Sequence, residues 1–348
     1  MNLLALSFPL ITGLALAISA WICRRAESLQ LIQVPTSRSS HEIPTPSGGG
    51  LGIVVAASLG GAGLVLFFGW TLGGLVLGLG LLLAVMGLRD DVRHLSAYVR
   101  LSVQLAVCAG FLIALGDLPS ISFSDDLKLE HAWVLMGVLL LAGVWWINLF
   151  NFMDGIDGIA GAQAIFMLLG GAALSAWVSA EVMSNPIWML MQYIAAATGG
   201  FLLLNWPPSK IFMGDVGSTW LAFMLFALAM LSVQAGWLSY ITWLVLSALF
   251  VTDATTTLLT RILRRERWYE AHCCHAYQRL TRRWIDNRKS SHGAVTLLAI
   301  GINLLWIWPL AAATIWLPAG NWFWLSLAYL PLSVGVLWTG KTDSLKNT

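Results

Sequence analysis

Aspartates in this sequence stand at positions where they could hold a divalent cation against a phosphate. They occur as the pair Asp90-Asp91, as Asp154 with Asp157, and as Asp215. Carboxylates with Mg²⁺ and nearby basic side chains carry out phosphoryl transfer in many enzymes. These residues therefore predict a magnesium-dependent phosphotransferase, provided that the fold brings them together.

The segment 148–158 has the most informative spacing. An amide or acid side chain recurs at every third position, and two glycines allow the chain to bend around a ligand. In a helix, residues three apart share a face, and such oxygen-rich side chains suit a hard cation or ribose hydroxyls. The four polar residues are Asn148, Asn151, Asp154 and Asp157.

Two further acidic positions lie at the ends of apolar runs. Asp90 and Asp91 end one run, where the helix dipole and their mutual repulsion disfavour negative charge. The flanking arginines or a bound cation could each offset that charge. Asp215 begins another run, where it could cap the helix with Ser218, or leave the free N–H groups to a phosphate. Lys210 adds a positive charge nearby.

Two polar loops complete the set. Residues 39–50 contain two prolines and end in three glycines, which suits a ligand loop or a close helix contact. The loop 261–292 holds nine basic residues together with His272 and His275. Its consecutive cysteines lack the ligand spacing of zinc sites. The histidines suit a nucleotide diphosphate better.

Composition decides what must position these segments. The chain is 58% apolar and 10% charged, against about 25% charged in soluble domains. Its apolar runs are continuous, which favours helices over a barrel. We expect an all-α polytopic membrane protein, a single domain over 1–348. Its eleven expected spans are 3–23, 48–68, 70–88, 99–116, 132–150, 158–178, 187–204, 216–234, 237–260, 293–316 and 321–338.

The basic residues predict the orientation of the chain. Of the 19 lysines and arginines, all but Lys128 fall in one set of loops, which is then cytoplasmic. The N-terminus would lie outside and the C-terminus in the cytoplasm. The cytoplasmic loops that carry the motifs, and hence the expected active site, are 24–47, 89–98, 148–158, 205–218 and 261–292.

Five motifs, in this order, resemble those of the polyprenyl-phosphate N-acetylhexosamine-1-phosphate transferases, the MraY/WecA family. The motifs are Ser-Ser-His-x-x-Pro-Thr-Pro-x-x-Gly-Gly over 39–50, Asp-Asp over 90–91, Asn-x-x-Asn-x-x-Asp-Gly-x-Asp-Gly over 148–158, Phe-Met-Gly-Asp-x-Gly-Ser over 212–218 and His-x-x-His-x-Tyr-Gln-Arg over 272–279. The resemblance covers about residues 35–280, and the span count is similar to that of the WecA-type branch.

The resemblance implies transfer of an N-acetylhexosamine 1-phosphate from a UDP-sugar to undecaprenyl phosphate, with release of UMP. It implies Mg²⁺, with Mn²⁺ as a substitute, in a bacterial inner membrane, and a lipid-linked envelope glycan such as O-antigen. It places Asp215 and Asp154 on the metal and Asp90, Asp91, Asp154 and Asp157 in catalysis. The substrate-binding residues it implies are His41, Thr45, Asn148, Asn151, Lys210, Phe212, His272, His275 and Arg279.

Departures from the family pattern bear on the donor. Cys273 stands where related enzymes often carry arginine, and the lysine-rich first loop of the muramyl-pentapeptide branch is missing. Both favour a smaller UDP-N-acetyl sugar over the peptidoglycan precursor. Membrane lipid is an expected partner and nucleic acid is not, while a homodimer is left open.

A secondary transporter is the alternative class, because Asp253 falls within the expected ninth span. A transporter should also show paired broken helices and charges at mid-membrane. Most acids here lie instead on the predicted cytoplasmic side, which favours the enzyme.

Overall fold

The computed structural model describes residues 2–35, 43–123, 128–265, 275–284 and 288–344. These residues are helical almost throughout, as expected, with two short antiparallel strand pairs in loops. The helices are α1 Asn2–Arg25, α2 Gly50–Phe68, α3 Thr71–Val92, α4 Ala97–Leu115, α5 Ala132–Met153, α6 Ile159–Val178, α7 Pro186–Asn205, α8 Asp215–Gln234, α9 Tyr240–Leu246, α10 Ala248–Leu263, α11 Ala276–Arg283, α12 Arg288–Ile302, α13 Trp308–Trp316 and α14 Asn321–Ser344. The strand pairs are β1 Ile32–Gln33 with β2 Thr45–Pro46, and β3 Ile121–Ser122 with β4 Lys128–Leu129.

The expected span count is confirmed. Among the described residues, ten helices are long and apolar enough to cross a membrane, and a bent pair brings the number to eleven. One of the ten runs from α12 through the π-helical turn Asn303–Ile307 into α13. The chain is therefore a multi-pass membrane protein.

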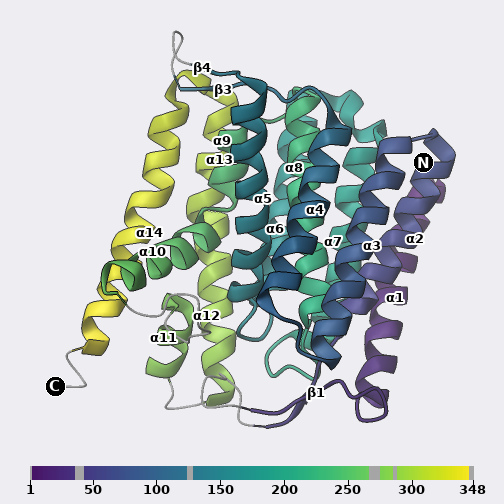
Figure 1. The fold of residues 1–348 in the computed structure, drawn as a ribbon, viewed down its shortest axis with the longest axis vertical. Coiled ribbons are helices and arrows are strands. Elements are labelled where there is room, and N and C mark those ends of the chain that lie inside the picture. Colours follow the sequence, from purple (N-terminus) through teal and green to yellow (C-terminus); the bar gives the residue numbers. More distant parts are fainter. Residues whose placement is uncertain (1, 36–42, 124–127, 266–274, 285–287, 345–348) are drawn as a thin grey trace.

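The expected span over 237–260 is sharply bent, which the sequence pattern did not predict. Helices α9 and α10 meet at an angle of 77°, and Figure 1 shows α10 crossing the direction of its neighbours towards α14. The Gln163 side-chain amide donates to the Leu246 carbonyl at the break, at 3.1 Å. Hydropathy records the length of an apolar run and not its direction, so the sequence pattern missed the bend.

Helix α8 forms the centre of the bundle. Its entire span is buried, whereas only 11% of the span containing α14 is buried. Its hydroxyl groups are satisfied within the helix, as where Ser232 donates to the Ala229 carbonyl at 2.8 Å. Burying polar groups in this way costs little because each has a partner. Helices α2, α3, α5 and α6 pack around α8.

Glycines bring neighbouring helices close to the beginning of α8. A Cβ on Gly50 of α2 would lie 2.3 Å from the Gly217 Cα, and one on Gly87 of α3 would lie 2.4 Å from the Asp215 carbonyl oxygen. No side chain fits at either position. The three-glycine run that ends at Gly50 therefore serves helix packing, one of the two interpretations of its sequence.

The bundle brings the expected active segments to one end. In Figure 1, α3 and α5 end, and α8 begins, at the lower end of the bundle, where β1 and α11 also lie. Helix α1 begins at the opposite end and α14 finishes at the lower one. Which end faces the cytoplasm remains a prediction from the basic residues.

Candidate functional site

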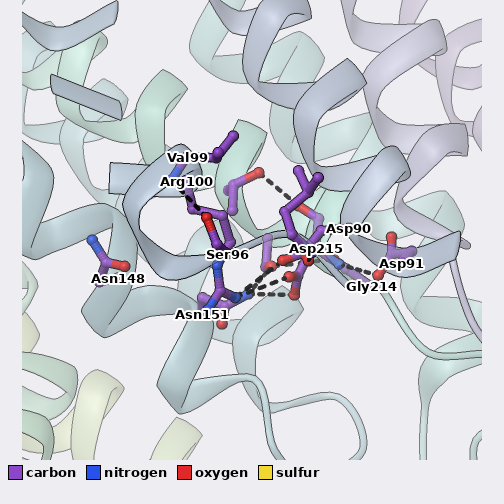
Figure 2. A network of polar contacts seen from close by, with 12 residues as sticks. Asp90, Asp91, Ser96, Val99, Arg100, Asn148, Asn151, Gly214 and Asp215 are labelled. Atoms are coloured by element: carbon purple, nitrogen blue, oxygen red, sulfur yellow. Dashed lines mark hydrogen bonds and ion pairs between the residues drawn. The ribbon is translucent and has the colours of Figure 1, made fainter. Parts of the chain in front are cut away.

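Four helix ends form a polar cluster at the lower end of the bundle. Asp90 and Asp91 come from the end of α3, Arg100 from the start of α4, Asn151 from the last turn of α5 and Asp215 from the start of α8. Figure 2 shows these side chains gathered together with Gly214. Segments far apart in the sequence thus meet at one site.

Asp91 caps helix α8 from outside that helix. Its two carboxylate oxygens accept from the backbone N–H groups of Asp215, at 2.8 Å, and of Val216, at 3.1 Å. Gly214 permits this approach, because a Cβ there would lie 2.7 Å from Asp91 Oδ2 and its φ is +74°. Neither sequence alternative for this helix end is therefore correct: Asp215 does not cap α8, and these two N–H groups already bind a carboxylate.

Asp90 is the buried partner of Arg100. Its Oδ2 lies 3.0 Å from Arg100 Nη1, and its Oδ1 accepts from the Leu95 N–H at 2.6 Å. The same guanidinium nitrogen lies 3.9 Å from Asp215 Oδ2, while the Arg100 side chain is 40% exposed. Arg100 thus places a positive charge between two aspartates and remains open to a ligand.

Sequence reasoning counted Arg100 only as a topological charge. The signal available was its place ten residues after Asp90, near the start of an otherwise uncharged helix. An arginine there can reach back to the end of the preceding helix, and the short connection between the two helices favours such a contact.

Asn151 links α5 to α8. Its side-chain amide donates to Asp215 Oδ1 at 2.7 Å and lies 2.9 Å from Ser218 Oγ. The amide orients the Asp215 carboxylate without neutralising it. Asn148, one turn earlier, donates instead to Gln104 Oε1 at 2.7 Å and to the Val144 carbonyl. Figure 2 shows Asn148 to one side of the cluster.

Asp154 lies at the end of α5, where negative charge accumulates. Burial raises the pKa of Asp154 well above its ordinary value, and the charges of Asp215, Asp91 and Asp157 raise it further. Each acid thus disfavours ionisation of the next. A cation bound here would relieve that repulsion.

The donor set fits a metal ion shared with a substrate. Among the described residues, no three histidine, cysteine or acidic side chains are grouped closely enough to hold an ion by themselves. Mg²⁺ commonly takes one or two protein carboxylates and completes its shell with water and substrate phosphate. Asp215 and Asp154 can supply those carboxylates, since Asp90 is paired with Arg100 at 3.0 Å and Asp91 caps α8 through both of its oxygens.

Asp157 joins three segments beside this cluster. Its carboxylate accepts from the Ser209 N–H at 3.0 Å and hydroxyl at 2.8 Å, and lies 3.3 Å from His292 Nδ1. Its carbonyl accepts from Thr296 at 2.8 Å. These contacts hold the α7–α8 loop and α12 at the site. His292 closes the 261–292 loop, and sequence reasoning assigned it no role because it lies outside the 272–279 motif of that loop.

The remaining loop residues form a backbone framework. The Phe212 N–H donates to the Pro46 carbonyl at 2.8 Å, and the Phe212 carbonyl accepts from Gly49 at 2.9 Å. Thr45, in β2, donates its hydroxyl to the Ile43 carbonyl. Lys210 is exposed on the same loop as Phe212. Two predicted substrate ligands, His41 and His272, lie outside the described residues.

The last predicted ligands lie on or beside α11. His275 Nδ1 is 3.5 Å from Asp253 Oδ1, and both side chains are buried. Arg279 donates to the Val336 carbonyl at 2.9 Å and to Thr339 Oγ1 at 3.0 Å, both on α14. These contacts join Arg279 to the last span, a role that the substrate-binding prediction did not include.

Comparison with known proteins identifies a matching family and several relatives. Residues 74–233 match the family model described as glycosyl transferase family 4. The chain is 28% identical over 308 residues to a probable undecaprenyl-phosphate N-acetylglucosaminyl 1-phosphate transferase of Bacillus subtilis, covering 87% of this chain and 83% of that protein.

Two other relatives are matched over a smaller part of their length. A decaprenyl-phosphate N-acetylglucosaminephosphotransferase of Mycobacterium tuberculosis is 31% identical over 218 residues, which are 58% of this chain and 54% of the relative. A phospho-N-acetylmuramoyl-pentapeptide-transferase of Kocuria rhizophila is 31% identical over 247 residues, 57% of this chain and 65% of the relative. The chain thus spans about half the length of the mycobacterial protein.

Proposed function

Because this chain belongs to the polyprenyl-phosphate hexosamine-1-phosphate transferases of glycosyl transferase family 4, we propose that it transfers an N-acetylhexosamine 1-phosphate to undecaprenyl phosphate. The donor is a UDP-N-acetyl sugar and the second product is UMP. The names of the Bacillus and mycobacterial relatives make UDP-N-acetylglucosamine the first donor to test.

The observation that carries the proposal is the excess of carboxylates around one partly exposed arginine. Asp90 and Asp215 lie beside Arg100, Asp91 binds the beginning of α8, and burial together with the charges of Asp215, Asp91 and Asp157 raises the pKa of Asp154. Such a cluster binds a cation and, with that cation, anionic phosphates. Its place at the end of a membrane bundle suits a lipid phosphate as one substrate.

In the proposed reaction, an oxygen of the lipid phosphate attacks the sugar-linked phosphorus of the donor. The bond from that phosphorus to the bridging oxygen breaks, and UMP leaves with that oxygen. A phosphomonoester has its second pKa near 6, so the acceptor is largely dianionic at neutral pH and needs no strong base. Arg100 is placed to offset charge on one of the two phosphates.

Asp90 and Asp91 position the site in this scheme. Both oxygens of Asp90 are engaged by Leu95 and Arg100, and both oxygens of Asp91 by the beginning of α8. A carboxylate held in this way is a poor nucleophile. The contacts therefore favour direct transfer over a two-step route through a phosphorylated aspartate.

Asp215 and Asp154 would hold Mg²⁺, or Mn²⁺ in its place, and the ion would neutralise charge that develops on the donor phosphates. Asn151 keeps the Asp215 carboxylate in one orientation. We place the reaction at the cytoplasmic face of a bacterial inner membrane. A lipid-linked envelope glycan such as O-antigen would be built on the product.

The direct test uses purified protein, undecaprenyl phosphate, Mg²⁺ and a panel of UDP-sugars, with UMP release as the readout. Release that requires both the lipid and one UDP-N-acetyl sugar is the expected result. No release with any donor, under conditions where the protein is folded, would refute the function.

A second experiment tests the direct route. Incubation with UDP-sugar and Mg²⁺ alone should leave every aspartate unmodified by mass spectrometry. A phosphorylated aspartate formed in the absence of lipid would establish the two-step route instead.

A further inference from the structure

Helix α11 is held at its beginning by Asp253 of α10. The two oxygens of this carboxylate accept from the Ala276 N–H at 2.8 Å and the Tyr277 N–H at 3.0 Å. His275, directly before the helix, lies 3.5 Å from the same carboxylate. Asp253 is 5% exposed, so water does not compete for these contacts. The position of Tyr277 is therefore fixed by a residue of the bent span.

Tyr277 passes that constraint to the turn that carries Asp154. Its hydroxyl donates to the Phe152 carbonyl at 2.9 Å, two residues before Asp154. On the other side of Asp154, a Cβ on Gly155 would lie 2.0 Å from the same hydroxyl oxygen. The phenol thus contacts the backbone on both sides of the acid.

The phenol is also kept in its donor form. Burial raises the pKa of Tyr277 well above its ordinary value, and the charges of Asp253 and Asp154 raise it further. A protonated hydroxyl can donate the hydrogen bond to the Phe152 carbonyl.

The far end of α11 is tied to the last span. Arg279 donates to the Val336 carbonyl and Thr339, and Arg283 donates to the Thr339 carbonyl. Because α11 has only eight residues, contacts at both ends leave it little freedom to move. It acts as a short brace between α10, α14 and the end of α5.

We propose that Tyr277 is a positioning residue, which sets the 152–155 turn so that the Asp154 carboxylate points into the site, with Asp253 holding Tyr277 in place. The inference rests on the proposed function, since Asp154 is assigned to the reaction there. Tyr277 itself need touch neither substrate.

The test is Tyr277→Phe, which removes only the hydroxyl. The matched control is Tyr240→Phe, because Tyr240 also donates to a backbone carbonyl, that of Pro119, at 2.9 Å, outside the cluster. We expect kcat to fall about tenfold in Tyr277→Phe with KM for both substrates nearly unchanged, as for a displaced catalytic group. Hydrogen exchange of the 152–158 amides should accelerate in this variant and not in the control.

A double-mutant cycle makes the contact itself testable. Gly155→Ala places a methyl group against the hydroxyl and should also lower kcat. Adding Tyr277→Phe removes the clashing oxygen, so the double variant should be more active than Gly155→Ala alone. Additive losses would mean that the two residues act independently, and would overturn the proposal.

Failure of this inference and failure of the proposed function give different results. Unchanged kcat and unchanged exchange in Tyr277→Phe, with an active wild type, would refute the positioning role alone. If Tyr277→Phe accelerates hydrogen exchange at 152–158 but the wild-type protein transfers no sugar phosphate, the proposed function alone is refuted.

Discussion

The same structural device occurs twice in this molecule, at the beginnings of α8 and α11. In each case an aspartate from another helix accepts hydrogen bonds from two consecutive backbone N–H groups, Asp91 for α8 and Asp253 for α11. The surroundings differ. Asp253 is buried beside His275. Asp91, in contrast, directly follows Asp90 and accepts a hydrogen bond from the backbone of Asp215, so that three acids lie together.

The difference separates a structural cap from a functional one. At α11 a neighbouring imidazole can balance the carboxylate within the protein. At α8, Arg100 is the one basic side chain among the described residues that forms an ion pair with these acids, and the acids outnumber it. Charge left unbalanced by the protein is available to a ligand, which is why we assign the α8 cluster to the reaction.

The largest expected effect comes from Asp215→Asn, which changes charge at α8 and leaves its backbone cap intact. Activity should fall by about three orders of magnitude or more, because an amide is a poor metal ligand and cannot orient the substrate phosphates through a metal ion. Thermal stability should not fall, since repulsion among the acids decreases. UMP release and thermal denaturation measure the two effects, and appreciable activity at any Mg²⁺ concentration would contradict the assignment.

Exchanging the two caps for amides tests the comparison directly. Asp91→Asn should lower activity about a hundredfold and the free energy of unfolding by about 1 kcal/mol, the usual value of a lost cap. Asp253→Asn should lower the free energy of unfolding by about 3 kcal/mol, because it breaks a buried pair, with a smaller loss of activity. Denaturation and kinetic measurements on both variants test this. A larger loss of activity in Asp253→Asn and a larger loss of stability in Asp91→Asn would overturn the distinction between the two caps.

A smaller effect is expected for Arg100→Lys, which keeps the charge but loses the planar guanidinium. One ammonium group cannot reach Asp90 and a phosphate with the same geometry, so kcat/KM should fall about tenfold. Arg100→Gln, which loses the charge, should be worse. Equal activity of the lysine and glutamine variants would show that the charge of Arg100 is not used.

The smallest effect is a pH dependence of stability from Asp154. The pKa of Asp154 is raised in the folded protein. Protonated Asp154 therefore contributes to the free energy of unfolding in full below its pKa in the unfolded chain, and this contribution is lost as pH rises through its pKa in the folded protein. Without Mg²⁺, the midpoint of thermal denaturation should fall by a few degrees over that rise. Mg²⁺ should restore it most at the higher pH.

Asp154→Asn is the control for this measurement, because an amide does not titrate in that range. The variant should lose most of the pH dependence and most of the Mg²⁺ effect. A wild-type denaturation midpoint that responds to Mg²⁺ equally at low and high pH would place the cation elsewhere.

Features with a clear linear signal could be predicted from the sequence. Apolar runs gave the span count, and the spacing of Asn151, Asp154 and Asp215 across the ends of predicted spans anticipated their meeting at one end of the bundle. Topology alone makes this possible, since alternate loops of a bundle share a face.

Features that depend on tertiary partners could not be predicted. The bend after Leu246 is supported by Gln163 of α6, the cap of α8 comes from Asp91 of α3, and Asp157 binds a histidine 135 residues further along the chain. No local pattern records such pairs. Arg279 illustrates the same limit, because a basic residue beside a family motif is an equally good candidate for substrate binding and for anchoring a helix.

The burial of α8 has a consequence for the membrane around it. A helix without lipid contact does not respond directly to bilayer thickness, whereas peripheral helices tilt to match the hydrocarbon layer. Helix α14 is such a peripheral helix, and Arg279 links it to α11. We therefore expect the length of the lipid acyl chains to shift the position of Asp154 while Asp215 stays in place. The lipid environment would then change the distance between the two acids of the site.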